Sequence, residues 1–259
     1  MSSLGITWNL WHGCHPISAG CQNCYVYRMD RAYGRDPCVV YRTSDFNLPL
    51  RRRRDSSYVL SPGQTVYTCF TSDFFLPEAD SWRPEAWAMM RQRPDLHFFI
   101  ITKRIDRIEE GLPQDWENGY GNVTLGCTAE NNDRAAFRLP IFLNLPIRHR
   151  FIVCEPLLEA VDLWSYLSNK IEGVIVGGES GENARPCRYE WVLNIREQCV
   201  ERGIPFTFRQ TGSRFLKDGR LYRIPHRLQL RQARAAGIDF SGTAPVSPLL
   251  EEDGEEFGW

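Results

Sequence analysis

The sequence has very few lysines, no long apolar run and no secretory signal. Of its 31 basic residues only Lys103, Lys170 and Lys217 are lysines, so the other 28 are arginines. This bias fits either a GC-rich genome or bidentate binding of phosphate or carboxylate groups. A membrane helix needs about 18 consecutive apolar residues, and a signal peptide needs a basic segment followed by an apolar one. Because the sequence contains neither, we expect a cytoplasmic protein that does not enter a membrane.

The sequence also lacks the glycine-rich fingerprint of dinucleotide-binding folds after its first expected strand, at 6–9. Six later apolar runs begin about 23 to 32 residues apart, close to the length of one strand–helix unit. Helices are expected between them, most clearly at 83–93 and 188–202. This alternation predicts an α/β fold with a parallel (β/α) barrel, full or partial, and an open doubly wound sheet is the alternative. The six runs are 65–70, 97–101, 122–126, 150–154, 173–176 and 205–208.

Composition divides the chain into three predicted regions. Residues 1–212 are expected to form a single barrel domain, with an irregular excursion at 39–62. Residues 213–240 are predicted to be a basic helical extension, with a helix at 227–236. Residues 241–259 are predicted to be an acidic flexible tail, because a Ser-, Gly- and Pro-rich stretch is followed by acidic residues.

The cysteines indicate a metal centre. Nine cysteines without a secretory signal favour free thiols or metal ligands over disulfides. Cys14, Cys21 and Cys24 form a C-x6-C-x2-C pattern directly after the first expected strand. Two kinds of metal centre fit this pattern: a [4Fe–4S] cluster with three cysteine ligands, or a zinc ion with His12 or His15 as the fourth ligand. In the cluster, one iron would lack a protein ligand and would be free for chemistry.

Several segments together resemble a known family. They are TWNLWHGC at 7–14, the three cysteines with Tyr25, CEPLL at 154–158 and GGESG at 177–181. The chain resembles, over 6–212, the phage-associated three-cysteine-motif family of unknown function, which is itself similar to radical S-adenosylmethionine (SAM) enzymes. The resemblance implies a partial barrel and a [4Fe–4S] cluster bound by the three cysteines. It also implies that one electron reductively cleaves SAM to a 5′-deoxyadenosyl radical, which takes hydrogen from a substrate.

Two features depart from the main radical SAM pattern. The usual cysteine spacing is C-x3-C-x2-C, whereas the first gap here is six residues. The Gly-Gly-Glu element that usually follows the second strand stands here after a late strand, at 177–179. By order along the chain, Ser72 and Asp73 occupy the second-strand place. Either Asp73 or Glu179 could therefore accept a hydrogen bond from the SAM amino group.

Polar residues follow the predicted strands, at the barrel end where active sites lie. By the resemblance, Glu130 and Asn131 suit ribose hydroxyls, while Lys103 and Arg209 could neutralise a carboxylate or a phosphate. Cys69, Cys127 and Cys154 are expected to be core residues rather than ligands. The predicted SAM-binding residues are Ser72, Asp73, Glu130, Asn131, Gly177, Gly178 and Glu179. The predicted catalytic residues are Lys103, Glu155, Arg209 and Gln210.

The substrate is indicated only by the C-terminal part of the chain. Residues 205–236 contain eight basic residues and one acid, a net charge of +7, interleaved with aromatic residues such as Phe215 and Tyr222. This composition favours a nucleic acid or nucleotide substrate, although a solvated basic helix is the alternative. An electron donor and a partner protein are the other expected partners. The sequence also fits two alternative functions: a nucleic-acid-binding protein whose Fe–S or zinc site is structural, and a metal-stabilised interaction module.

Overall fold

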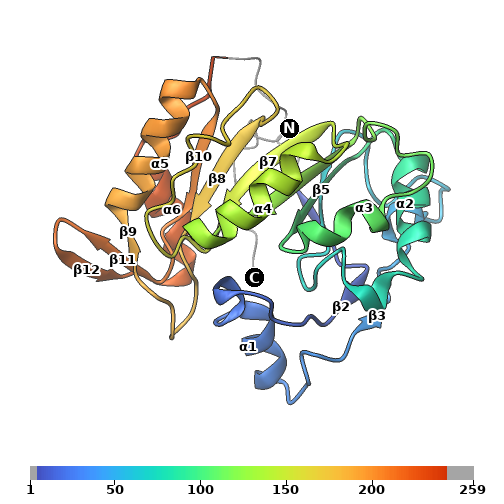
Figure 1. The fold of residues 1–259 in the computed structure, drawn as a ribbon. Coiled ribbons are helices and arrows are strands. Elements are labelled where there is room, and N and C mark those ends of the chain that lie inside the picture. Colours follow the sequence, from blue (N-terminus) through green and yellow to red (C-terminus); the bar gives the residue numbers. More distant parts are fainter. Residues whose placement is uncertain (1–4, 244–259) are drawn as a thin grey trace.

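The computed structural model describes residues 5–243 and is built around one seven-stranded parallel sheet (Figure 1). The strand order is β1-β4-β5-β6-β7-β8-β10, so the strands of this sheet lie in the order in which the chain forms them. The sheet curls into half of a barrel, which confirms the predicted α/β class and the partial barrel. The strands are β1 (Ile6–Trp8), β4 (Thr65–Thr68), β5 (His97–Thr102), β6 (Val123–Thr128), β7 (His149–Cys154), β8 (Gly173–Gly177) and β10 (Phe206–Gln210).

Helices such as α4 and α5 cover the outside of the curled sheet, whereas α1 lies apart from that surface (Figure 1). Strand β6 is buried at all six positions, which explains its continuous rather than alternating hydrophobicity. Helix α5 ends where Gly203 adopts a left-handed φ of 68°, as the sequence predicts. The helices are α1 (Tyr25–Ala32), α2 (Arg83–Gln92), α3 (Ile108–Gly111), α4 (Asn132–Asn144), α5 (Tyr189–Arg202) and α6 (His226–Ala235). None of the helices among residues 5–243 has the length and apolar character to cross a membrane.

Two small sheets lie outside the main one. Strands β2 (Trp11–His12) and β3 (Tyr41–Arg42) pair antiparallel and bring the excursion at 39–62 back beside the first strand. The second small sheet contains β9 (Cys187–Arg188), β11 (Arg214–Lys217) and β12 (Arg220–Arg223).

The region 213–240 contains helix α6 at the position of the predicted helix 227–236, but its first part is not helical. A hairpin, β11–β12, precedes helix α6, and Asp218-Gly219 forms its turn with φ values of 51° and 72°. Asp-Gly is a strong hairpin signal because both turn positions need positive φ. The backbones of Phe206 and Phe240 exchange two hydrogen bonds, so the region closes against strand β10. Most of the predicted acidic tail, residues 244–259, lies outside the described residues.

Two tryptophans hold the N-terminal segment in the core. Trp8 and Trp11 are completely buried, and each indole N–H donates to a distant backbone carbonyl. The Trp11 indole bonds the Asp73 carbonyl at 3.1 Å, and the Trp8 indole bonds the Phe46 carbonyl at 3.1 Å. Buried indole groups usually need such partners. These contacts fix the chain immediately before the cysteine loop.

A buried ion pair holds helix α4 on strand β6. Arg138 and Glu130 are 2.7 Å apart, and their side chains are 1% and 0% exposed. Removing one partner of such a pair leaves an uncompensated charge in the core, which costs about 3–5 kcal/mol.

We therefore expect Arg138→Met to lower the free energy of unfolding by about 3–5 kcal/mol in urea denaturation. Arg134→Met, on the same helix but partly exposed, is the matched control and should cost less than about 1 kcal/mol. Glu130→Leu combined with Arg138→Met should recover part of the loss because neither charge is then left alone. Equal losses in the two arginine variants would contradict this assignment.

Candidate functional site

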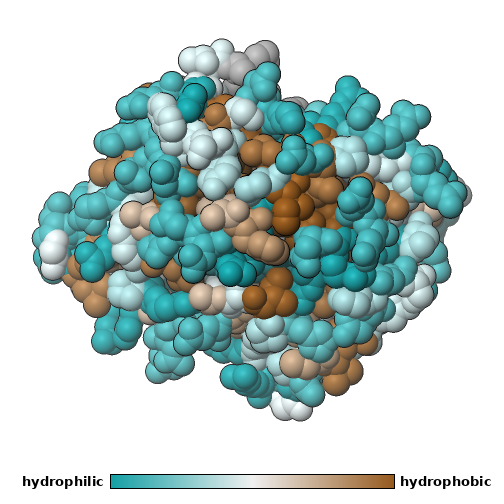
Figure 2. All heavy atoms as spheres, in the orientation of Figure 1, coloured by the Kyte–Doolittle hydropathy of each residue, from teal (hydrophilic) through white to brown (hydrophobic). Residues whose placement is uncertain are grey.

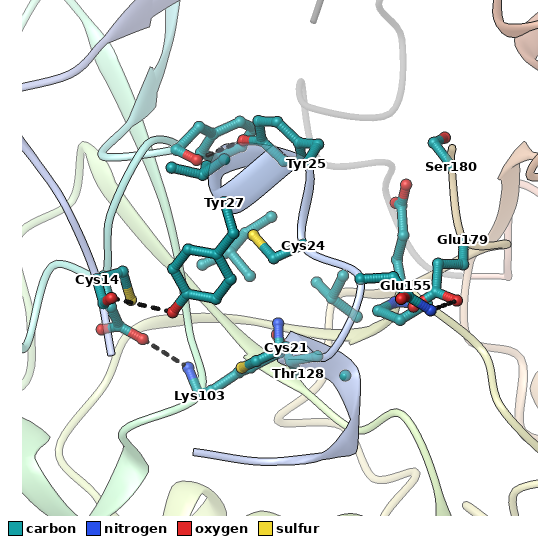
Figure 3. Close-up of a pocket in the computed structure, with 18 of the residues that line it drawn as sticks. Cys14, Cys21, Cys24, Tyr25, Tyr27, Lys103, Thr128, Glu155, Glu179 and Ser180 are labelled. Carbon is teal, nitrogen blue, oxygen red and sulfur yellow. Dashed lines mark hydrogen bonds between the residues drawn. The ribbon is translucent and has the colours of Figure 1, made fainter. Parts of the chain in front are cut away.

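A pocket opens at the carboxyl ends of the parallel strands, where a (β/α) barrel places its active site (Figure 3). Its volume is about 270 Å³, close to the lower limit of about 300 Å³ for small-molecule sites. Eleven of the fourteen residues that the sequence singles out line it: Cys14, Cys21, Cys24, Ser72, Asp73, Lys103, Glu155, Gly178, Glu179, Arg209 and Gln210. Glu130, Asn131 and Gly177 do not appear in its lining.

The three cysteines border the same pocket as free thiols. Cys21 ends a short 3-10 helix, Ala19–Cys21, and Cys24 immediately precedes helix α1. The Tyr27 hydroxyl, one turn into α1, donates to the Cys14 carbonyl at 3.0 Å (Figure 3). The local helices therefore turn the loop so that all three cysteines border one space.

Each thiol has a hydrogen-bonding group near its sulfur. Burial raises the pKa of Cys14 to about 12, and Asp73 adds to the rise, although Arg104 opposes it with an Nη1 atom 3.9 Å from the sulfur. Burial also raises the pKa of Cys24, although hydrogen bonds from backbone N–H groups in the first turn of α1 oppose the rise. The Ser18 hydroxyl lies 3.9 Å from the Cys21 sulfur. Burial therefore disfavours ionisation of the Cys14 and Cys24 thiols.

The cysteines do not close around a single ion. Among residues 5–243, no group of three or more His, Cys, Asp or Glu side chains is arranged to hold one metal ion. The two histidines considered as zinc ligands are paired with carboxylates: His12 with Asp30 at 2.7 Å and His15 with Glu78 at 2.6 Å. The two histidines that could complete a tetrahedral zinc site are therefore engaged with carboxylates instead.

Glu179, predicted to bind SAM, holds the cysteine loop instead. Its carboxylate accepts hydrogen bonds from the Asn23 side chain at 2.9 Å and from the backbone and guanidinium of Arg185 at 2.5–3.0 Å. Arg185 also donates to the Ala19 carbonyl at 2.9 Å. Burial raises the pKa of Glu179, but these donors outweigh it and hold the pKa below its usual value. Both carboxylate oxygens are therefore occupied within the protein.

The Asp73 carboxylate also accepts hydrogen bonds from the protein and helps to hold the cysteine loop. Its carboxylate accepts from the Thr102 hydroxyl at 2.7 Å and from the Lys103 backbone N–H at 3.1 Å. The Arg104 guanidinium lies 3.4 Å from the same carboxylate and donates to the His15 carbonyl at 2.8 Å. Asp73 thus orients an arginine that grips the loop next to Cys14.

Glu130 and Asn131 have local partners. The Glu130 carboxylate pairs with Arg138 and accepts from the Gly20 backbone N–H at 3.4 Å, which gives the loop a third attachment. Asn131 caps helix α4 by accepting from the Arg134 backbone N–H at 2.9 Å. Their suggested contact with a ribose stays a prediction, and neither borders the pocket.

The far side of the pocket carries a second polar cluster. Arg209 donates to both Glu155 carboxylate oxygens, at 2.9 and 3.0 Å, and Gln210 donates to one of them. Gly177 makes room for this cluster, because a Cβ there would lie 2.7 Å from the Glu155 carboxyl carbon. At Gly178 a Cβ would lie 2.3 Å from the Thr211 carbonyl oxygen. The two glycines therefore allow close packing of strands β7, β8 and β10.

Two pocket residues have side-chain donors with no hydrogen-bond partner in the described part of the chain. The Thr128 hydroxyl is fully buried and unpartnered, and it lines the pocket. The Lys103 ammonium makes no hydrogen bond or ion pair within residues 5–243, although it lowers the pKa values of Cys24 and Glu130 through its charge. Thr102 pairs with Cys127 across β5 and β6, so Lys103 and Thr128 are neighbours at the strand ends.

The remaining cysteines are core residues, as predicted. Cys69, Cys127 and Cys154 are at most 2% exposed, and Cys187 and Cys199 are also buried. Burial raises the thiol pKa of all five. They behave as small apolar side chains rather than as ligands.

One protein-family model matches most of the chain. A family model described as "Protein of unknown function (DUF5131)" matches residues 3–244. The chain belongs to this family. No match was found among curated proteins or among solved structures. Membership in DUF5131 agrees with the resemblance to a family of unknown function and leaves its phage association and radical SAM chemistry as proposals.

Sequence reasoning missed four residues of this DUF5131 site: Asn23, Arg104, Arg185 and Thr128. Asn23 lies inside the C-x2-C pair, and Arg104 follows Lys103 at a strand end, so both had a positional signal. Arg185 had none, because it lies in an irregular loop and its partners are the distant Ala19 and the nearby Glu179.

The depressed pKa of Glu179 gives stability that depends on pH. A carboxylate whose pKa is lower in the folded protein stabilises it above the unfolded value, about 4.3, and loses this effect as the pH falls through the folded value. Glu179→Gln should therefore lower the free energy of unfolding by about 2 kcal/mol at pH 7.

In urea denaturation from pH 7 to pH 3, this difference from the wild type should shrink below about pH 4.3. Glu182→Gln, an exposed carboxylate three residues away, should change stability little at any pH. A difference for Glu179→Gln that is constant over the whole range would show that its charge does not stabilise the loop.

Proposed function

We propose that this chain is a radical SAM-like iron–sulfur enzyme that reductively cleaves SAM and acts on a nucleic acid or a nucleotide-type substrate. The observation that carries the proposal is that Cys14, Cys21 and Cys24 border one pocket at the strand ends of a partial barrel. The family resemblance and the phage association that it includes belong to the same proposal.

The donor set suits a [4Fe–4S] cluster, because such clusters are bound by cysteine thiolates and three cysteines border one pocket. Arg104, Ser18 and the N–H groups of α1 lie beside the three sulfurs. Hydrogen bonds to the sulfurs of such clusters tune their potential. Three cysteines would hold the cluster and leave one iron for the SAM amino and carboxylate groups.

When bound, the cluster supplies one electron that splits the sulfonium–carbon bond of SAM and yields a 5′-deoxyadenosyl radical. The chain itself binds and orients the ligands and excludes water. Lys103 and Thr128 suit a carboxylate, because a cationic and a hydroxyl donor stand together without protein partners. Asp73 and Glu179 would act mainly by holding the loop. Glu155, Arg209 and Gln210 form the opposite wall, where a substrate would be oriented.

The chemistry requires partners from outside the chain. A reduced cluster needs an electron donor, and a partner protein that delivers the target is also part of the proposal. The alternative function is a nucleic-acid-binding protein whose Fe–S or zinc site is structural and supports no turnover. The basic hairpin and helix near the C-terminus favour nucleic-acid binding in either case.

Anaerobic purification and metal analysis test the proposed centre. We expect about four irons and four sulfides per chain and a broad visible band, both lost in Cys14→Ser, Cys21→Ser or Cys24→Ser. Cys38→Ser is the matched control, because Cys38 is an exposed thiol of the same segment and does not line the pocket. Reduced protein with SAM should form 5′-deoxyadenosine. One zinc per chain and no visible band would support the alternative.

Variants of the two unpartnered donors test ligand binding. Lys103→Met and Thr128→Val should each weaken SAM binding, with Lys103→Met losing roughly tenfold or more because a charge-assisted hydrogen bond contributes about 1.5–3 kcal/mol. Calorimetric titration of the iron-loaded protein measures this. Lys170→Met is the control, because Lys170 lies on the surface, outside the pocket lining, and its ammonium group donates to the Leu143 carbonyl. Unchanged binding in Lys103→Met would remove this residue from the ligand site.

A further inference from the structure

The hairpin β11–β12 and helix α6 form one basic surface, which we call the basic arm. Six of its exposed or partly exposed basic residues are Arg214, Lys217, Arg220, Arg223, Arg227 and Arg231. In Figure 1 the hairpin projects from the edge of the molecule beside α6, and in Figure 2 this end is mainly hydrophilic with hydrophobic residues scattered over it. The arm is therefore open to a partner.

The register of the hairpin places like charges opposite one another. Arg214 pairs with Arg223, and Lys217 pairs with Arg220, one pair on each face of the two-stranded ladder. Like charges directly across a strand pair destabilise it. Helix α6 repeats the arrangement, because Arg227 and Arg231 are four residues apart. The arm thus concentrates positive charge at some cost to its own stability.

The described part of the chain does not neutralise this charge. None of the six basic residues forms an ion pair with an acid among residues 5–243. The acids nearest in sequence are Asp218, in the hairpin turn, and Asp239, whose pKa is raised by burial although Arg234 opposes the rise. Charge repulsion that is not relieved internally can be relieved by a polyanion.

Apolar side chains are exposed on the same arm. Leu221 and Tyr222 are 46% and 39% exposed, on opposite faces of β12. The Arg220 guanidinium lies 5.0 Å from the centre of the Tyr222 ring. Exposed aromatic rings among cations are typical of surfaces on which unpaired bases stack while arginines contact the phosphates. A purely acidic protein partner would not need the ring.

The arm is attached directly to the pocket. Ser213, which precedes β11, donates its backbone N–H to the Glu179 carbonyl at 2.8 Å and accepts from the Gly181 N–H at 2.8 Å. Gln229 of α6 bonds both Ser180 and Ser213, and His226 at the start of α6 lines the pocket. A strand lying on the arm would therefore pass the pocket mouth.

From this juxtaposition we propose that the basic arm binds the phosphate backbone of single-stranded nucleic acid and leads it past the pocket. Arginine is suited to this contact because its planar guanidinium can bind phosphate oxygens in pairs. Tyr222 offers a stacking surface for a base. The delivery of a nucleotide to the pocket rests on the proposed function, whereas binding by the arm does not.

Fluorescence anisotropy of the full-length, metal-loaded protein with a 20-nucleotide single strand tests the arm. We expect Arg214→Gln/Arg223→Gln and Arg227→Gln/Arg231→Gln each to weaken binding about tenfold or more near 100 mM salt. The slope of log K against log salt should fall by about 1.4, since each lost phosphate contact removes about 0.7. Tyr222→Ala should weaken binding without changing that slope.

Arg54→Gln/Arg148→Gln is the matched control, because both arginines are exposed and precede strands β4 and β7, at the opposite end of the sheet from the pocket. It removes the same charge and should weaken binding less than about twofold. Equal effects in the arm and control variants would overturn the proposal that the basic arm binds the nucleic acid. Tighter binding to a duplex of the same sequence, or to polyglutamate, would also overturn the proposal in favour of another partner.

A cysteine variant separates this inference from the proposed function. Cys14→Ser should abolish 5′-deoxyadenosine formation and leave oligonucleotide binding intact. Oligonucleotide binding without SAM cleavage in the wild type would support binding by the basic arm and contradict the proposed enzyme activity. SAM cleavage with no oligonucleotide binding would support the enzyme activity and contradict binding by the basic arm.

Discussion

The site depends on a set of carboxylates that hold an irregular loop over the ends of the parallel strands. The loop from Cys14 to Cys24 has only one short 3-10 helix, so few hydrogen bonds of its own define its shape. Asp73 acts through Arg104, Glu130 binds the Gly20 N–H, and Glu179 binds Asn23 and Arg185. A buried carboxylate is costly unless donors surround it, so each of these carboxylates requires its hydrogen-bond donors to stay in place. Charge pairing and hydrogen bonding thus hold the cysteine loop in place.

This arrangement gives the two walls of the pocket different chemical groups. One wall carries the three thiols and the cations around them, and the opposite wall carries Glu155 with Arg209 and Gln210. Between them, Lys103 and Thr128 have donors that no described side chain uses. Residues that are saturated by protein contacts hold the site together, whereas unsaturated ones are available to a ligand. The basic arm extends the same site beyond the pocket.

The elements that could be predicted are those whose signal is local. The strands follow from apolar runs buried on both faces, such as β6, and α5 follows from its apolar face and the stop at Gly203. Helix α4 lies where a helix is expected between two apolar runs, but the sequence predicts no bounds for it, and Pro140 inside it weakens the local helix signal. The β11–β12 hairpin was missed although Asp218-Gly219 is a turn signal, because the high density of arginines suggested a basic helix.

The sequence by itself determined the strand–helix alternation, the α/β class with a parallel sheet and the position of the three cysteines after the first strand. These features depend on residues close together along the chain. Only the tertiary structure decided which acids hold the loop and which donors remain open to a ligand. Asn23 and Glu179 are 156 residues apart, and Arg104 reaches back 89 residues to the His15 carbonyl. Such partners are brought together by the curvature of the sheet, and no local pattern of residues records them.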